Sequence, residues 1–281
     1  MQTTPREPEV PSIRQNDGAR IPQVGLGLYG PADDQAASVV DTALRLGYRS
    51  LDTAALYQNE VGVGEGIRRS EIPREDIYLT TKLHSSSHGY GAALTAFDRS
   101  LERLGVDYVD LYLIHWPLPG LDRYVESWKV LETILASGRA KSIGVANFQP
   151  AHLQRLFDET GVVPAINQIE LHPGFQNHAV RKFNTRNGIL TEAWSPLGRG
   201  RVFKDAVLEK IAQKYSRTIA QVVIRWHIEI GNVVIPKSVT AYRQAENLDV
   251  FSFELDAEDM AAIAGLENGI RTGDDPDEFN G

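Results

Sequence analysis

Cysteine is absent from this sequence of 281 residues, and that absence excludes disulfide bonds and zinc sites built on cysteine. No apolar run reaches the length of about 18 residues that a membrane-spanning helix needs, so we expect no transmembrane helix. The first residues, MQTTPREPEVPSI, lack the basic and then apolar pattern of a signal peptide, and we interpret residues 1–9 as a loose polar arm. Together these absences favour a cytoplasmic protein, although the absence of cysteine also fits an exported chain.

Positive charge is also scarce along the chain. The formal net charge is −8, and no run of Lys or Arg is longer than two residues. Such a surface argues against binding to nucleic acid or to an anionic membrane. An anionic ligand would therefore need a local basic cluster to offset the general negative field, and one appears late in the chain, in IPKSVTAYRQAEN.

What the sequence does contain is a regular alternation of apolar runs and amphipathic stretches. Eight runs have the length of a strand, and several lack polar alternation, as expected for strands that are covered on both faces. They lie at residues 23–28, 48–52, 77–83, 108–115, 141–147, 164–171, 188–194 and 232–237. Nine helical segments are predicted at 34–46, 91–104, 123–137, 151–159, 177–187, 205–215, 218–229, 240–248 and 256–266. Alternation on this scale predicts a single α/β domain over residues 1–281, folded as a (β/α)8 TIM barrel.

Two segments fall outside this alternation. Asn16, Asp17 and Gly18 form a turn signal between two short extended arms, which predicts a β-hairpin that closes one end of the barrel. The C-terminal tail from Gly269 onward has the composition of a loop.

A doubly wound dinucleotide-binding fold is the main alternative to the barrel. GLGLYG at residues 25–30 matches G-x-G-x-x-G, and Asp52 follows at about the distance of a ribose-binding acid. However, Pro31 and the acidic pair 33–34 put the start of the helix after the glycines, which weakens the geometry of a phosphate cradle.

A second pattern, Tyr78-Leu-Thr-Thr-Lys82, has the Y-x-x-x-K spacing of short-chain dehydrogenases. Their chemistry needs both side chains on one face of a helix. On a strand, four residues span roughly 13 Å, so we expect that Tyr78 and Lys82 do not act together.

Polar side chains at strand ends are the better candidates, because reactive residues of such barrels lie where strands end and loops begin. The ends of three consecutive strands carry Asp52, Lys82 and His115, and Tyr57 follows in the loop after Asp52. Tyr57 could donate a proton, since a nearby Lys82 would favour the phenolate and lower the pKa of the phenol. Asp52 would hold the ammonium, and His115 could hydrogen-bond a substrate carbonyl. The pattern predicts protonation of an oxygen as hydride reaches its carbon.

Each of these residues also has an ordinary structural interpretation. Asp52 could cap a helix near residue 59, and Tyr57 could be a half-buried aromatic. Lys82 could be solvated, and His115 could be a core histidine. The combination of all four at strand ends is what favours chemistry.

Several segments are similar to signature segments of the aldo-keto reductase superfamily, in the same order, across residues 25–255. The closest resemblance is to the prokaryotic branch of 2,5-diketo-D-gluconate reductases and glyoxal reductases. The segments are LDTAALYQNE, TTKL, LYLIHWP, SIGVANF, AINQIELHP, EAWSPLG and IPKSVTAYRQAENLDVF. The resemblance implies NADPH-dependent reduction of aldehydes and ketones, with dicarbonyls such as methylglyoxal or keto-sugars as candidate substrates. It also implies that Tyr57 is the proton donor and that Asp52, Lys82 and His115 are its catalytic partners.

Further residues receive a role by matched motif only. Asn147 and Gln168 resemble the pair that bonds the nicotinamide carboxamide, and Trp194 resembles the aromatic that stacks on the nicotinamide ring. The 2′-phosphate would be bound by Lys237, Ser238 and Arg243, although the same segment alone could be a strand end and a helix. The resemblance implies further cofactor contacts from Gly27, Leu28, Ser195, Leu197, Gly198, Ile235, Val239, Glu246 and Asn247, and substrate contacts from Tyr29, His84, His115 and Trp116.

The chain also departs from the family pattern. Ala146 occupies a position where Ser is usual, so one hydrogen bond to the carboxamide is expected to be missing. His84 replaces a common Trp, Tyr29 lies where a pocket aromatic is expected, and Gln58 replaces a usual Gly. The changes at Ala146, His84 and Tyr29 are expected to bear on substrate preference and not on the reaction.

The sequence leaves three competing functions to consider. Paired carboxylates at barrel strand ends suggest a glycosidase, and Glu170 and Glu192 are so placed, although the reductases share the motif that follows Glu170. A metal hydrolase lacks support, because no H-x-H or H-E-x-x-H spacing occurs among the seven histidines. A non-catalytic nucleotide-binding barrel subunit is the third alternative. We expect a small-molecule carbonyl as the partner, no metal, and a monomer.

Overall fold

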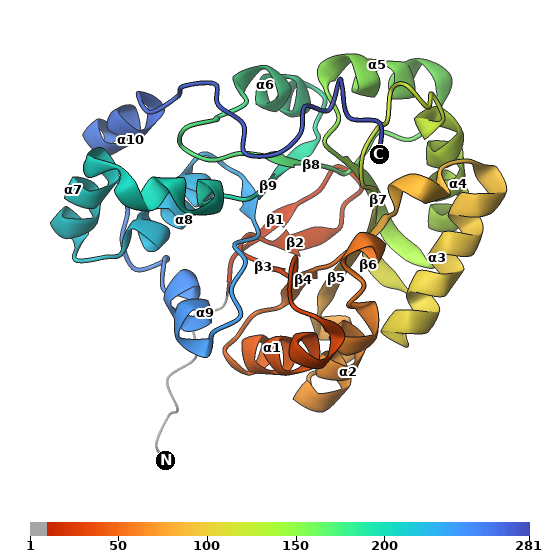
Figure 1. Cartoon of the computed structure of the whole chain (residues 1–281), viewed down its shortest axis with the longest axis horizontal. Helices are drawn as coiled ribbons and strands as arrows, with labels where there is room; N and C mark the ends of the chain where they lie inside the picture. The colour runs from red at the N-terminus through yellow and green to blue at the C-terminus, as the bar shows by residue number, and fades with distance from the viewer. Residues whose placement is uncertain (1–9) are drawn as a thin grey trace.

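Eight parallel strands form one sheet that curls into a barrel in the computed structural model, which describes residues 10–281 (Figure 1). The sheet runs in the order β10-β9-β8-β7-β6-β5-β4-β3. Its two edges meet, because Val24 pairs in parallel with Val234 and Gly27 pairs in parallel with Lys237. Helices surround the strands in Figure 1, so the predicted (β/α)8 architecture is confirmed.

The strands of this sheet are β3 Leu26–Gly27, β4 Ser50–Asp52, β5 Tyr78–Leu83, β6 Val109–Ile114, β7 Ala140–Ala146, β8 Ile166–Glu170, β9 Leu190–Trp194 and β10 Val233–Val234. The helices are α1 Asp33–Arg45, α2 Glu60–Ser70, α3 Tyr90–Leu104, α4 Tyr124–Ala136, α5 Pro150–Glu159, α6 His178–Arg186, α7 Ala206–Tyr215, α8 Ile219–Glu229, α9 Ala241–Leu248 and α10 Ala257–Ala264. Short 3₁₀ turns are η1 Ala55–Tyr57, η2 Arg74–Asp76, η3 Ser85–Ser87 and η4 Gly198–Lys204.

Each predicted strand and helix corresponds to an observed element, with ends that shift by a few residues. The apolar faces predicted for the helices pack on the barrel. In α3, for example, Phe97, Leu101 and Leu104 are buried against the sheet. Burial of such a side chain contributes about 1.5–3 kcal/mol.

The glycines of GLGLYG close the barrel and do not begin a dinucleotide-binding helix. A Cβ on Gly25 would lie 2.9 Å from Ser50 Oγ, and one on Gly27 would lie 2.8 Å from Ile235 O. The chain therefore needs glycine at both positions to approach its neighbouring strands. With α1 beginning only at Asp33 and the sheet closed, the doubly wound alternative is excluded.

Helix α2 was not predicted, since none of the nine predicted helical segments covers its residues. Its sequence, EVGVGEGIRRS, contains three glycines and reads as a poor helix former. The structure explains them by close packing, because a Cβ on Gly62 would lie 2.0 Å from Asp33 O and one on Gly64 would lie 1.9 Å from Leu104 O. The glycines let α2 fit tightly between α1 and α3, and tertiary packing outweighs local propensity.

The predicted hairpin is confirmed and lies at the end of the barrel where strands begin. Strands β1 Ser12–Arg14 and β2 Arg20–Pro22 pair in antiparallel fashion around the predicted turn. Gln15 Nε2 donates to the hydroxyl of Tyr78 at 2.6 Å, at the first residue of β5. Tyr78 and Lys82 thus lie at opposite ends of one strand, as the strand geometry predicted.

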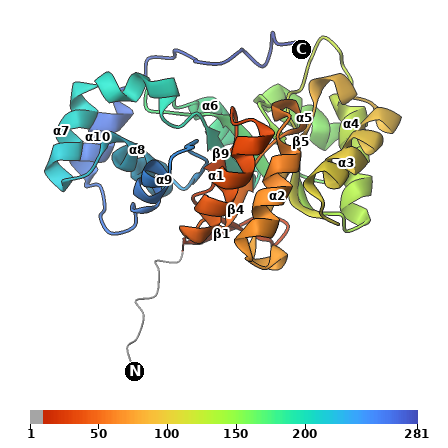
Figure 2. The ribbon, with the colours of Figure 1, turned by 60° about the horizontal axis from the view of Figure 1, so that its bottom comes forward.

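The C-terminal tail crosses the opposite end of the barrel. Figure 2 shows it running from α10 over the top of the molecule, while β1 lies at the bottom. In residues 10–281, no helix has both the length and the apolar character required to span a membrane. The arm predicted at 1–9 lies outside the described residues.

Candidate active site

Asp52 and Lys82 form a buried ion pair at the ends of adjacent strands. Lys82 Nζ lies 2.5 Å from Asp52 Oδ1 and donates a second hydrogen bond to Thr53 O at 2.9 Å. The side chain of Lys82 is 0% exposed, so it is not the solvated lysine that one interpretation of the sequence allowed. Asp52 likewise bonds inside the barrel and caps no helix.

The ion pair keeps Lys82 charged. Burial disfavours the ammonium, but Asp52, with smaller contributions from Tyr57 and Glu192, outweighs this effect, and the pKa of Lys82 is raised above 10.5. A fixed positive charge therefore remains inside the barrel.

Tyr57 lies beside this charge, at the end of the turn η1. Its ring centre is 5.2 Å from Lys82 Nζ, and the ring is half-buried. Burial raises the pKa of Tyr57, and Lys82 lowers it again without offsetting the whole effect. The expected net lowering of this pKa is therefore wrong for the protein alone, because burial outweighs the cation. The phenol is protonated at neutral pH and can act as a proton donor.

His115 packs edge-on against Tyr57, with ring centres 5.8 Å apart. Burial and the nearby charge of Lys82 lower the pKa of His115 well below 6.5, so its ring is neutral at pH 7. Its Nδ1 is buried and has no hydrogen-bond partner in the described part of the chain. Since an orphaned N–H is rarer than an orphaned acceptor, the proton is favoured on Nε2. His115 is thus a core histidine with one donor to offer to a ligand.

A cleft of about 850 Å³ opens over these residues at the strand-end face of the barrel. Most residues predicted from the sequence line it. They are Gly27, Leu28, Tyr29, Asp52, Tyr57, His115, Trp116, Asn147, Gln168, Trp194, Ser195, Leu197, Ile235, Lys237, Ser238, Arg243, Glu246 and Asn247.

Asn147 is held from two sides at the floor of this cleft. Its Nδ2 donates to His115 O at 2.9 Å, and its Oδ1 accepts from Trp194 Nε1 at 2.8 Å. The backbone of Asn147 has a left-handed φ of 65°, which few residues other than Gly and Asn adopt readily. The amide therefore fixes the indole of Trp194 against the wall of the cleft.

The far end of the cleft carries uncommitted positive charge. Within residues 10–281, neither Lys237 nor Arg243 forms an ion pair, although both are exposed on a chain with a net charge of −8. Lys237 reaches the loop after β3, where a Cβ on Gly30 would lie 3.8 Å from its Nζ. Arg243 lies in the first turn of α9, a helix whose N-terminal residue Thr240 makes no side-chain cap bond. Cations and free amides together suit a phosphate.

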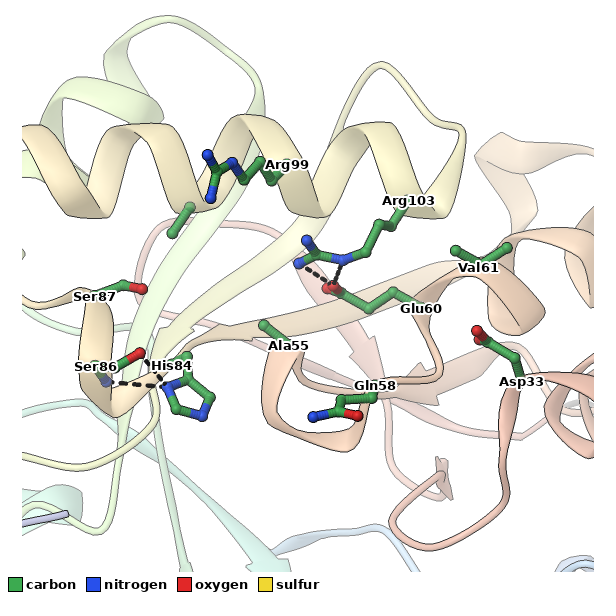
Figure 3. Close-up of a pocket in the computed structure, with 11 residues that line it drawn as sticks. Asp33, Ala55, Gln58, Glu60, Val61, His84, Ser86, Ser87, Arg99 and Arg103 are labelled. Atoms are coloured by element: carbon green, nitrogen blue, oxygen red, sulfur yellow. Dashed lines mark hydrogen bonds and ion pairs between the residues drawn. The ribbon is translucent and has the colours of Figure 1, made fainter.

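Four predicted residues do not line the cleft. Lys82 lies behind Asp52, fully buried, while Val239 is exposed and Gly198 packs near His172. His84 lies in a neighbouring pocket of about 360 Å³, where its Nδ1 accepts from Ser86 N at 3.0 Å (Figure 3). His84 thus does not contribute to the wall of the main cleft.

Several lining residues were not predicted from the sequence. Leu56, Phe203 and Tyr242 border the cleft with exposed apolar side chains, and Asp274 and Phe279 reach it from the tail. Exposed aromatics and a loop-like tail give no periodic signal, so only the folded arrangement reveals them.

The tail is fastened to the site by Glu170, at the end of β8. Its carboxylate accepts from Thr272 N and Oγ1, each at 2.6 Å, and from Gly273 N at 3.0 Å. Phe279 packs against Trp116 at a tilt of 44°, with ring centres 4.5 Å apart. Although burial acts in the opposite direction, hydrogen bonds from His172 and the tail lower the pKa of Glu170 to about 2. The carboxylate of Glu170 is thus used to hold the tail, whereas the carboxyl of Glu192 bonds Gln168.

Comparison with known proteins gives consistent matches over nearly the whole chain. Residues 23–268 match the model of the Aldo/keto reductase family. An aldo-keto reductase of Mycolicibacterium smegmatis is 53% identical over 96% of this chain and 98% of its own, and the methylglyoxal reductase DkgA of Escherichia coli is 49% identical over the same shares.

Solved structures agree with these relatives. A variant of Gox0644 in complex with NADPH is 52% identical, with a TM-score of 0.92 over 96% of this chain and 98% of its own. A Bombyx mori aldo-keto reductase in complex with NADP is 35% identical, with a TM-score of 0.90 over 96% of both chains.

Proposed function

This chain belongs to the aldo/keto reductase family and reduces carbonyl compounds with NADPH, and from that premise we propose that Tyr57 is its proton donor. We propose dicarbonyl compounds such as methylglyoxal, or keto-sugars, as substrates, since a relative of 49% identity is named a methylglyoxal reductase. The observation that carries the proposal is the buried ion pair of Lys82 and Asp52 beside the phenol of Tyr57.

The described residues suit an NADPH molecule lying along the cleft. Lys237 and Arg243 would bind the 2′-phosphate with Ser238 nearby, because they are cations without a partner at one end. Trp194 would offer its ring as a stacking surface for the nicotinamide at the other end. Asn147 and Gln168 would bond the carboxamide with their side-chain amides. When bound, NADPH supplies the hydride for the carbonyl carbon.

The protein's own groups handle the proton. His115 donates from Nε2 to the carbonyl oxygen and holds that oxygen near the hydroxyl of Tyr57. Tyr57 transfers its proton to this oxygen as negative charge develops there. Lys82 stabilises the phenolate left behind, because an opposite charge at this range favours the ionised form. Asp52 keeps Lys82 charged and aimed at the ring.

A substrate panel tests the proposal directly. Purified protein is mixed with NADPH and with methylglyoxal or a keto-sugar, and the loss of the NADPH absorbance is compared with the alcohol formed. We expect one alcohol per NADPH consumed. NADPH binding without turnover on any carbonyl would instead support the non-catalytic barrel subunit, and cleavage of a glycoside would support the glycosidase.

Domain extent, oligomeric state and location belong to the same proposal. We treat residues 1–281 as one aldo-keto reductase domain that acts as a monomer in the cytoplasm. Light scattering on the purified chain tests the monomer, since a dimer would double the mass of 31.1 kDa.

A further inference from the structure

Glu192 is a buried carboxyl group next to the proposed site with no role assigned to it so far. It lies in β9, is 1% exposed, and pairs in register with Gln168 of β8 and Val233 of β10. Its Oε2 accepts a hydrogen bond of 2.7 Å from Gln168 Nε2. Burial of a carboxyl group in the interior of a barrel costs free energy, so its presence there requires an explanation.

Gln168 connects this carboxyl group to the ion pair. The same Nε2 donates to Asp52 Oδ2 at 2.8 Å, across a separation of 116 positions in the chain. Strands β4 and β8 are not neighbours in the sheet, so this bond runs through the barrel interior. An amide nitrogen has two N–H groups, and here both are used by carboxyl oxygens.

That bonding fixes the orientation of the amide. The reverse orientation would place the carbonyl oxygen of Gln168 against the carboxylate of Asp52, which electrostatic repulsion disfavours. With Nε2 committed on both sides, only Oε1 is left to serve a ligand in the cleft that Gln168 lines. An acceptor at this point suits the amino group of a carboxamide.

The charge of Glu192 matters for the same group of residues. Burial, with a further contribution from Asp52, raises the pKa of Glu192 to about 8. The charged or titratable groups that face it are Asp52 on β4 and Lys82 and Tyr78 on β5. The neutral carboxyl leaves the Lys82–Asp52 pair balanced. Ionised, it would add a second negative charge beside Asp52 and within range of Lys82, and so weaken the support that Lys82 gives to a phenolate at Tyr57.

We propose that Glu192 is a positioning residue of the reductase site, which holds Gln168 against Asp52 with its carbonyl oxygen turned toward the cofactor. This inference rests on the proposed function. Glu192 touches neither substrate nor reacting atoms and acts through Gln168.

Two variants separate this role from a structural one. Glu192→Leu removes the bond to Gln168, and we expect NADPH to bind about fivefold more weakly and kcat to fall, since one hydrogen bond is worth about 1 kcal/mol. Glu192→Gln keeps a side-chain oxygen that can accept the bond and should restore most of both losses. It cannot ionise, so the loss of kcat that we expect of wild type as pH rises through about 8 should be reduced or absent in this variant.

Tyr112→Phe is the matched control, because it removes a buried hydroxyl outside the site. It should retain the wild-type pH profile. If Glu192→Leu binds NADPH as tightly as wild type, or if Glu192→Gln binds it as weakly as Glu192→Leu, the inference is overturned. If Glu192→Leu fails to fold, a pH profile of kcat in Glu192→Gln that equals that of wild type between pH 6 and 9 overturns it. A wild-type protein without reductase activity would instead overturn the proposed function. In that case the NADPH affinities of the variants would still test whether Glu192 positions Gln168.

Discussion

The indole of Trp194 donates to the amide oxygen of Asn147 across 2.8 Å, so two residues that are 47 positions apart fix one wall of the cleft. Asn147 in turn bonds the backbone of His115. The surface proposed for the nicotinamide is therefore tied to the residue proposed to hold the substrate.

Two substitutions of Trp194 distinguish the contribution of ring stacking from that of the hydrogen bond to Asn147. Trp194→Ala should weaken NADPH binding by roughly 1 kcal/mol or more, because it removes the aromatic face. Trp194→Phe keeps a ring and loses only the bond to Asn147, so its loss should be smaller. Titration followed by tryptophan fluorescence and by calorimetry measures both, and the quench at Trp194 must be judged against the signal of Trp116 and the other indoles. Equal affinities for wild type and Trp194→Ala would place the ring elsewhere.

Lys237 and Arg243 should set the preference for NADPH over NADH. Charge-assisted bonds to a phosphate contribute about 1.5–3 kcal/mol each, so wild type should prefer NADPH by ~10²-fold or more. The double change of Lys237→Ala and Arg243→Ala should erase most of this preference and leave NADH binding almost unaltered. The control changes Lys182→Ala and Lys210→Ala, which remove the same charge from exposed sites outside the cleft. Binding isotherms for both cofactors decide the question, and equal wild-type affinities would refute it.

Glu170 should govern the order of the C-terminal tail. Glu170→Gln removes a charge that accepts three hydrogen bonds from Thr272 and Gly273, so the tail should become more accessible. We expect limited proteolysis within residues 269–281 to accelerate by about tenfold or more, since bonds to a charged group are worth at least 1.5 kcal/mol. Preference among carbonyl substrates should change too, because Phe279 and Asp274 line the cleft.

Glu278→Gln is the control for this prediction, since Glu278 is an exposed carboxyl of the same tail. Mass spectrometry of the fragments identifies the cleavage positions. Identical cleavage rates in Glu170→Gln and wild type would show that other contacts hold the tail.

His227 should make the protein sensitive to acid. The ring is fully buried, and burial lowers its pKa to about 3, with smaller contributions from Arg181 and His172. In the unfolded chain a histidine titrates near 6.5, so the unfolded state binds more protons between these values. The contribution to stability is present above pH 6.5 and is lost as pH falls toward 3, by up to about 1.4 kcal/mol per pH unit.

Urea unfolding at several pH values measures this slope. His227→Gln should lose less stability than wild type between pH 6 and pH 4, whereas His178→Gln, at an exposed histidine, should follow wild type. Parallel curves for all three proteins would show that His227 does not control acid unfolding.

Sequence patterns predicted the barrel because its strands are continuous apolar runs and its helices carry regular apolar faces. The site followed from a geometric rule, since the ends of neighbouring parallel strands bring Asp52, Lys82 and His115 together. Sequence patterns missed α2, where packing overrides local helix propensity. Gly62 and Gly64 weaken its helical pattern, but they allow close packing against α1 and α3.

Other parts of the site have no local signal at all. The network through Gln168 depends on side chains that meet across the barrel, and the tail depends on Glu170, which lies 102 positions before Thr272. Gln58 shows a third case, because it adopts a left-handed φ of 53° where the family pattern has Gly. The pKa of Tyr57 likewise depends on the folded environment, because burial raises it and Lys82 lowers it.

Rates of NADPH oxidation with methylglyoxal in wild type and Tyr57→Phe test the central claim most directly. The substitution removes one hydroxyl, so kcat should fall by at least ~10²-fold, the usual scale of general acid catalysis, while NADPH affinity stays nearly intact. Tyr29→Phe, which removes the hydroxyl of the neighbouring ring 5.2 Å away, should lose far less activity. Near-normal turnover in Tyr57→Phe would contradict the assignment of Tyr57 as the proton donor.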